Sequence, residues 1–309
     1  MGIHNLKKIL HEEDAIKFYP SYESFYKKIF YPKIVYIGID FNLYYYKYQA
    51  VSDNIYKCFM NQIINLIQCR SIPIYIFDST PSRIKQYNKS KKKYGNKYIP
   101  YLNFKCFFDL LQIQYYQSKE EGDALAGVLY QNKIIDCALT NDVGDYICYG
   151  CDHVIEIKND GVMEYNYHII ENKLNFISKD EFVIFCILLG CDYFKNHLIM
   201  KHKYREIFYI FRNSPPFKSI DEYILQIFRI YKIYGMKKDN YMKIIDAFLL
   251  FTKNSNQKKK APIFDHFSKI DINSILFYLK KNDEMKTIFN NIPFSYISLI
   301  NKYKLINSR

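Results

Sequence analysis

Three short apolar segments, each with an aspartate at or next to its end, constrain the fold more than any other feature of this sequence. They are residues 33–41 (KIVYIGIDF), 72–78 (IPIYIFD) and 134–142 (IIDCALTND), and all three are rich in β-branched or aromatic residues. Runs of this length and composition are typical of strands that are buried on both faces of a parallel sheet.

Segments with helical periodicity separate these strands, over residues 52–68, 103–112 and 120–131. This alternation predicts an α/β fold with a mostly parallel central sheet flanked by helices. Ligands of open α/β sheets bind outside the carboxyl ends of the strands. We therefore expect the terminal acids Asp40, Asp78 and Asp142 to lie close together in space.

The second half of the chain has a different character, because its pattern is helical from about residue 180 onward. We predict a core over residues 1–205, made of an N-terminal block (1–100) and an internal acidic block (113–195). A helical C-terminal region over residues 206–309 follows it.

Acidic residues form the candidate site. Crowded carboxylates repel one another unless a divalent cation neutralises them, and ligand sets made only of oxygen select hard ions such as Mg²⁺ or Mn²⁺. Two such ions about 4 Å apart can bind one phosphodiester and activate water. For any single acid that follows a strand, the simpler alternative is a helix N-cap. The candidate ligands are Asp40, Asp78, Glu121, Asp123, Asp142, Asp145 and Asp192.

The spacing of these acids supports one site. Glu121 and Asp123 begin a predicted helix, where both can face the strand ends, and Asp142 and Asp145 can lie on one turn. Asp192 follows the apolar run ILLGC, where a carboxylate without compensation would be costly.

A basic segment follows the second strand. Residues 79–108 contain no acid, and tyrosines alternate with the basic residues there. Basic groups interleaved with aromatic rings bind phosphate backbones and stack on unpaired bases, whereas a charge run alone is usually a solvated loop. The position directly after Asp78 favours a nucleic-acid contact. The candidate contacts are Arg83, Lys85, Lys89, Lys91, Lys92 and Lys93.

The overall charge agrees with a polyanionic partner. The formal net charge is +13 and the sequence pI is about 9.1. An AT-rich genome, which inflates Lys, Ile, Asn and Tyr, is the alternative explanation for this composition. The eight cysteines lie mostly in apolar stretches and favour buried reduced thiols over structural zinc. The longest apolar run, Phe182–Cys191, is about half of the ~20 residues that a membrane span needs.

Six blocks resemble, in this order, the XPG-type flap endonuclease family. They are MGIHNLKKIL, IGIDFNLYYYK, IYIFDSTPSRIK, EEGDALAGVLY, TNDVGDYICYG and FCILLGCDYF, and the resemblance covers about residues 1–195. It implies a PIN-like 5′ nuclease core. It also implies a Mg²⁺-dependent structure-specific endonuclease or 5′ exonuclease that hydrolyses branched or flapped DNA to 5′-phosphate products in repair, recombination or replication.

The resemblance also implies roles for individual residues. Asp78, Glu121 and Asp123 would hold a first Mg²⁺ with Asp40 nearby, and Asp123, Asp142, Asp145 and Asp192 would surround a second, with Mn²⁺ as an alternative ion. Lys85 and Lys92 match catalytic basic residues, Tyr46 matches an aromatic that stacks on a base, and Gly2 matches a glycine near the DNA.

The chain departs from the family pattern in three places. Two residues, Val143 and Gly144, separate an acid pair that the family usually separates by one, so one acid of the pair is expected to be displaced. Only about 18 residues separate Lys85 from Asn103, which is short for a helical arch that threads a flap. The segment after Asp192 lacks the glycines of the family's DNA-gripping hairpin. The basic residues there that could hold duplex phosphates are Lys195, Lys201, Lys203 and Arg205.

Two other functions are compatible with the same residues. One is a 5′→3′ exoribonuclease, and the other is an inactive homologue that binds DNA structures, although the full acid set and Lys85 argue against the latter. We expect a monomer that binds branched, flapped or nicked DNA, with no membrane association and no clamp-binding motif. The compact length suggests a viral or reduced genome, with action in the nucleus (the host nucleus if viral) or at a cytoplasmic replication site.

Overall fold

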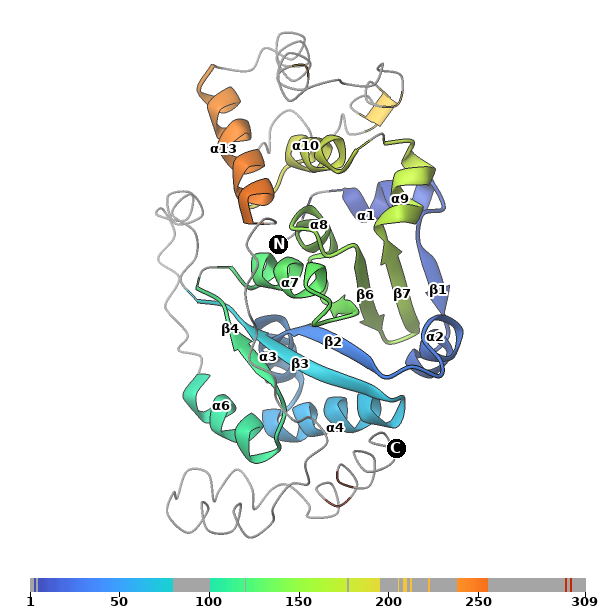
Figure 1. Ribbon diagram of the computed structural model, residues 1–309, viewed down its shortest axis with the longest axis vertical. Helices are drawn as coiled ribbons and strands as arrows, with labels where there is room; N and C mark the ends of the chain where they lie inside the picture. The colour runs from blue at the N-terminus through green and yellow to red at the C-terminus, as the bar shows by residue number, and fades with distance from the viewer. Residues whose placement is uncertain are drawn as a thin grey trace.

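A seven-stranded mixed sheet forms the centre of the protein (Figure 1). The computed structural model describes residues 3, 5–79, 101–119, 121–176, 178–194 and 238–254, with isolated residues between 205 and 301. The strand order is β1-β7-β6-β5-β2-β3-β4, and the pairings from β6 to β4 are parallel, whereas both pairings of β7 are antiparallel. The strands are β1 (Lys17–Tyr19), β2 (Val35–Asp40), β3 (Ser71–Phe77), β4 (Tyr115–Gln117), β5 (Cys137–Leu139), β6 (His153–Lys158) and β7 (Gly161–Asn166).

The three predicted strands correspond to β2, β3 and β5, and they are neighbours in the sheet. β2 is central, with β3 on one side and β5 on the other, and both pairings are parallel. In register, Asp40 lies opposite Ile76, and Ile39 lies opposite Leu139. The carboxyl ends of all three strands therefore meet at one edge, and the predicted α/β fold with a mostly parallel sheet is confirmed.

Helices cover both faces of the sheet (Figure 1). One face packs against an aromatic cluster in which Tyr75 and Phe108 stack with ring centroids 4.2 Å apart. The helices on that side are α2 (Tyr22–Ile29), α3 (Phe41–Val51), α4 (Ile55–Gln68) and α6 (Tyr101–Leu110). The other face packs against α1 (Leu6–Glu12), α7 (Gly122–Gln131), α8 (Val143–Cys148) and α9 (Tyr167–Leu174), with α10 (Lys179–Leu189) and α13 (Lys238–Asn254) beyond them.

Helices α3 and α4 begin at residues whose side chains cap them. The carboxylate of Asp40 accepts a hydrogen bond from Leu43 N (2.9 Å), and the side chain of Asn54 accepts one from Lys57 N (3.0 Å). Such a side-chain oxygen satisfies a backbone N–H that has no partner within the helix. The predicted helices at residues 52–68, 103–112 and 120–131 correspond to α4, α6 and α7.

Helix α10 contains the longest apolar run of the sequence. Its residues from Glu181 to Leu189 are all buried, which explains why the segment is apolar around the whole helix. None of the helices that the structure describes is long and apolar enough to span a bilayer. The predicted boundary near residue 205 stays a prediction, because beyond Phe194 only α13 and isolated residues are described.

The antiparallel strands β6 and β7 form a hairpin that the sequence analysis did not identify. Asn159 and Asp160 connect them, and Gly161 begins β7 with φ of 155°. An Asn-Asp-Gly sequence between two alternating segments is a recognisable hairpin pattern, so the sequence did contain a usable indication.

A buried polar cluster joins β1 to this hairpin. Glu164 on β7 is 3% exposed, and its carboxylate accepts a hydrogen bond from the Tyr19 hydroxyl (2.6 Å) and lies 3.0 Å from His153 Nε2. Burial alone would raise the pKa of Glu164, but the hydrogen bonds from His153 and Tyr19 outweigh burial, so the pKa is lowered.

This cluster predicts a specific loss of stability in acid. A carboxyl group whose pKa is lowered by folding stabilises the protein above its unfolded pKa of about 4.3, and this stabilisation is lost as the pH falls through the lower folded pKa. We expect Glu164→Gln to reduce the free energy of unfolding at pH 7 by about 1–3 kcal/mol. The difference from wild type should shrink toward pH 3 in urea unfolding experiments, and parallel pH profiles would contradict the prediction.

Candidate active site

Asp40 lies at the carboxyl end of β2 and is half-buried. In addition to its capping bond to Leu43, its Oδ2 accepts a hydrogen bond from Thr140 Oγ1 (3.3 Å), which follows β5. Burial, together with the negative charges of Asp78 and Asp142, raises the pKa of Asp40 to about 7 against the opposing effect of these hydrogen bonds. The three acids expected at the strand ends thus lie close enough to repel one another, and Asp40 both caps a helix and belongs to this group.

Asp78 directly follows β3 and is held on two sides. Its Oδ1 accepts a hydrogen bond from Gly122 N (2.6 Å), and its Oδ2 accepts one from Asn42 Nδ2 (2.7 Å). A Cβ atom at Gly122 would lie only 2.6 Å from Asp78 Oδ1, so the carboxylate occupies space that only glycine leaves open. Asn42 was not identified from the sequence, although it lies in the first turn of α3, two residues after Asp40.

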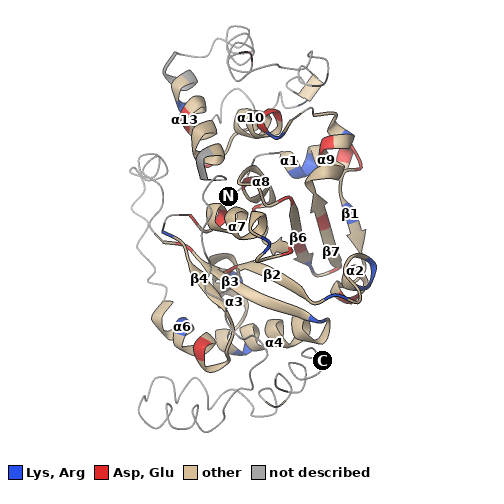
Figure 2. Ribbon diagram, in the orientation of Figure 1, with Lys and Arg blue, Asp and Glu red and all other residues tan. Residues whose placement is uncertain are grey.

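Glu121 and Asp123 lie at the start of α7, as predicted, and acidic residues mark this end of the helix in Figure 2. Glu121 is 7% exposed and Asp123 is half-buried. The buried phenol of Tyr146 lies near Asp123 and three of the other acids. Burial raises its pKa, and so do the charges of Asp40, Asp123, Asp78 and Asp142, which means that acids from four different segments act on one side chain.

The acids Asp142 and Asp145 differ in depth. Asp142 is the half-buried N-cap of α8, and its backbone N donates to Thr140 Oγ1 (3.1 Å). Asp145 is 4% exposed. Burial raises the pKa of the Cys191 thiol, which follows α10, and the charge of Asp145 raises it as well. One acid of the pair therefore lies near Asp40, whereas the other lies deeper in the protein.

Asp192 lies in a turn that follows α10. The backbone groups of Cys191 and Phe194 close this turn by donating to each other, at 3.1 and 3.2 Å. Asp192 itself is half-buried, one residue from the thiol on which the charge of Asp145 acts. The last predicted acid thus directly follows a residue on which the charge of Asp145 acts.

The chemistry of these donors fits a hard divalent cation. All seven acids offer oxygen, and the negative charges of Asp78 and Asp142 add to burial in raising the pKa of Asp40, so these three carboxylates would gain from a neutralising cation. No three acidic, histidine or cysteine side chains within the described ranges already enclose one metal position. The repulsion among the carboxylates of Asp40, Asp78 and Asp142 therefore indicates where a cation would bind, and not which atoms would coordinate it.

The other predicted site residues have different outcomes. Tyr46 is 45% exposed on α3, and Arg205 forms an exposed ion pair with Glu12 (3.0 Å). All eight cysteines are free thiols, including the Cys148/Cys151 pair. The remaining candidates lie outside the described residues: Gly2, Arg83, Lys85, Lys89, Lys91, Lys92, Lys93, Lys195, Lys201 and Lys203.

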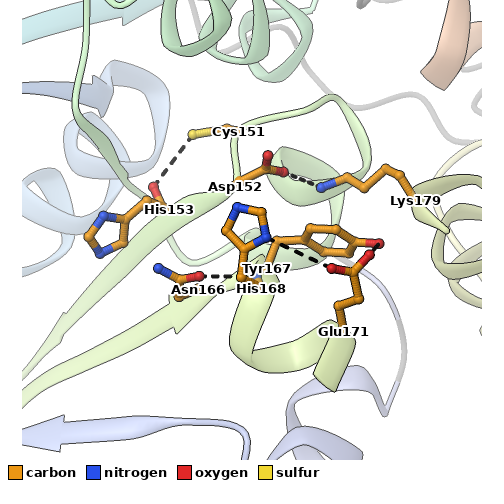
Figure 3. Close-up of polar contacts among 8 residues, drawn as sticks. All are labelled: Cys151, Asp152, His153, Asn166, Tyr167, His168, Glu171 and Lys179. Carbon is orange, nitrogen blue, oxygen red and sulfur yellow. Dashed lines mark hydrogen bonds and ion pairs between the residues drawn. The ribbon is translucent and has the colours of Figure 1, made fainter. Parts of the chain in front are cut away.

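A cavity of about 610 Å³ lies at the opposite ends of α7 and α8, where Gln131 and Cys148 line it. Figure 3 shows that its charged groups interact with one another. Lys179 forms an ion pair with Asp152 and lies 3.5 Å from the centroid of the Tyr167 ring, and the Tyr167 hydroxyl donates to Glu171 (3.1 Å). This cavity is separate from the acidic cluster.

Comparison with protein families and curated sequences gives consistent matches. Residues 112–192 match the XPG I-region, which includes five of the acids, from Glu121 to Asp192. The chain is 27% identical over 130 residues to "Probable RAD2-like endonuclease 369L" of Invertebrate iridescent virus 6, covering 39% of this chain and 30% of that protein. It is 37% identical over 90 residues to "Flap endonuclease 1" of Enterocytozoon bieneusi (strain H348), covering 27% and 25%. The matches thus span less than a third of each curated relative.

Similar solved structures cover most of the chain. The catalytic core of Rad2 in complex with DNA substrate has a TM-score of 0.67 at 13% identity, over 91% of this chain and 94% of that one. Human GEN1 in complex with Holliday junction DNA has a TM-score of 0.67 at 19% identity, over 99% and 78%. GEN1 with product DNA and a Mg²⁺ ion has a TM-score of 0.58 at 12% identity, over 90% and 72%. At these identities the likeness shows a shared fold.

Proposed function

We propose that this chain is a structure-specific nuclease of the XPG/Rad2/FEN1 kind, which hydrolyses phosphodiester bonds of branched or flapped DNA with the help of Mg²⁺. The observation that carries the proposal is the acidic cluster at the strand ends, where Asp40, Asp78 and Asp142 lie close enough to raise the pKa of Asp40. A cluster of this kind is costly for a fold to maintain unless a cation binds there.

The acids divide into two proposed sets of metal ligands. Asp78, Glu121 and Asp123 would hold one Mg²⁺ with Asp40 nearby, and Asp123, Asp142, Asp145 and Asp192 would hold the other. When bound, such ions lower the pKa of a water nucleophile and stabilise the leaving oxygen. The Mg²⁺ in a GEN1 structure of the same fold supports the choice of ion.

The chain's own residues would bind and orient the substrate. Lys85 and Lys92 are proposed to stabilise negative charge that develops on the scissile phosphate. The exposed ring of Tyr46 is available to stack on a base beside the cut. The basic residues of segment 79–108 would bind backbone phosphates, and the DNA in the similar Rad2 and GEN1 structures supports DNA as the substrate.

A panel of labelled nucleic acids tests this proposal. The panel contains a 5′ flap, a 3′ flap, a gapped duplex, a four-way junction, single-stranded DNA and single-stranded RNA, each incubated with Mg²⁺ or with EDTA. We expect Mg²⁺-dependent cleavage of at least one branched DNA and no cleavage in EDTA. Cleavage confined to RNA would instead favour a 5′→3′ exoribonuclease. Tight binding to branched DNA without cleavage would favour an inactive structure-binding protein.

A further inference from the structure

Asn42 links Asp78 to a tyrosine from another part of the chain. Its Nδ2 donates to Asp78 Oδ2 (2.7 Å), and its Oδ1 accepts a hydrogen bond from the Tyr101 hydroxyl (2.9 Å). An asparagine amide has a donor on one side and an acceptor on the other. Because the Tyr101 hydroxyl donates to the oxygen, the NH₂ group is directed toward Asp78.

We infer that Asn42 and Tyr101 are positioning residues that hold the Asp78 carboxylate in the orientation in which it binds a divalent cation. This inference rests on the proposed function, since it assigns Asp78 to the cation. It adds to that function two residues whose side chains act through Asp78 and need not contact the ion.

The two hydrogen bonds on Asp78 fix its carboxylate plane. Gly122 N holds one oxygen from the start of α7, and Asn42 Nδ2 holds the other from the start of α3. Hydrogen bonds to an ionised carboxylate are stronger than bonds between neutral groups. Each carboxylate oxygen has two lone pairs, so a single hydrogen bond to an oxygen does not by itself prevent that oxygen from binding a cation. The Gly122 donor is backbone, whereas the Asn42 donor can be removed by mutation.

Tyr101 is itself fixed by packing. Its ring lies 5.4 Å from the ring of Phe77 and 5.9 Å from that of Phe41, measured between centroids, and both phenylalanines are fully buried. Burial raises the pKa of Tyr101 to about 12, so its hydroxyl remains a donor at neutral pH. Changing Tyr101 to Phe therefore removes the hydroxyl while the ring contacts remain.

Tyr115 offers a matched control. Its ring also packs against Phe77, at 5.6 Å between centroids, but its hydroxyl donates to Asp109 (3.3 Å) and not to the acidic cluster. Tyr115→Phe thus removes one tyrosine hydroxyl from the same aromatic cluster without touching Asn42 or Asp78.

The test is Mn²⁺ binding to the DNA-free protein, followed by electron paramagnetic resonance. Loss of a group that orients a metal ligand typically weakens metal binding by about 10–100-fold, which we expect for Asn42→Ala. Tyr101→Phe should weaken binding by about threefold to tenfold, as expected for loss of one hydrogen bond. The double variant should bind no more weakly than Asn42→Ala, because Tyr101 acts only through Asn42. Tyr115→Phe should bind like wild type.

Unchanged Mn²⁺ affinity in Asn42→Ala, or fully additive losses in the double variant, would overturn the inference. If Asn42→Ala does not fold, the Mn²⁺ affinity of Tyr101→Phe tests the inference alone, because this variant preserves the packing of the ring. Unchanged affinity in Tyr101→Phe would then overturn the inference. Weakened binding in both variants of a protein that cleaves no nucleic acid would support the positioning role and refute the proposed function. A wild-type protein that binds no Mn²⁺ would overturn both.

Discussion

Replacing Asp78 by alanine is expected to abolish Mg²⁺-dependent cleavage while DNA binding remains largely intact. Both carboxylate oxygens of Asp78 are oriented by hydrogen bonds, one from Gly122 N and the other from Asn42. Loss of a ligand that holds a catalytic ion removes several kcal/mol of transition-state stabilisation, or about a thousandfold or more in rate. Binding should survive because most affinity for DNA comes from contacts with backbone phosphates.

Single-turnover cleavage and equilibrium binding, the latter in EDTA, measure the two expected effects separately. Asp160→Ala is a suitable control, since Asp160 is an exposed acid in the β6–β7 turn and lies outside the cluster. The Asp78 variant should be at least as stable as wild type without metal, because a charge that raises the pKa of Asp40 has been removed. Cleavage near the wild-type rate would refute the assignment of Asp78 as a ligand.

Gly122→Ala is expected to inactivate the protein without unfolding it. The added Cβ would lie 2.6 Å from Asp78 Oδ1, which is too close for contact, so the carboxylate must move. Alanine has a higher helix propensity than glycine, by up to about 1 kcal/mol. This gain offsets the stability that the local strain costs. A displacement of about 1 Å at a reacting centre can cost about a hundredfold in rate, so we expect a loss of at least this size.

Gly127→Ala in the same helix provides the contrast. A Cβ there would lie 2.0 Å from the carbonyl oxygen of Tyr149, which is backbone and cannot rotate away. This variant should lose stability by about 1–3 kcal/mol or more through overpacking of α7 against α8. Thermal unfolding and cleavage measured together separate the two cases. Equal losses of stability in both variants would contradict a specific effect at Gly122.

The sequence predicted the central strands and their acids because both are local features with a physical meaning in any parallel sheet. Asp40, Asp78 and Asp142 follow apolar runs, and the topology of α/β sheets brings such ends together. The strands β1 and β4 were not predicted, since these three-residue segments, unlike β5, do not lie within a longer apolar run. The division of depth between Asp142 and Asp145 depends on how α8 packs, which spacing alone does not specify.

The Asn42–Tyr101 link could not be predicted from the sequence either. The two residues are 59 positions apart, and nothing local distinguishes Tyr101 from the other tyrosines near it. Their contact follows from the packing of α6 and α3 in one aromatic cluster. The roles of Lys85, Lys92 and the basic residues around them stay predictions, because these residues lie outside the described part of the chain.

Because of the strand order at the centre of the sheet, the acidic cluster is formed by segments that are far apart in the sequence. β2 lies between β3 and β5, and Thr140 after β5 donates to Asp40, from which it is 100 residues away. A chain that has been synthesised only as far as β3 contains Asp40 and Asp78 but not the acids of α7, α8 or the turn after α10. Under the proposed function, we therefore expect a chain truncated after β3 not to cleave nucleic acid, because it lacks five of the seven proposed metal ligands.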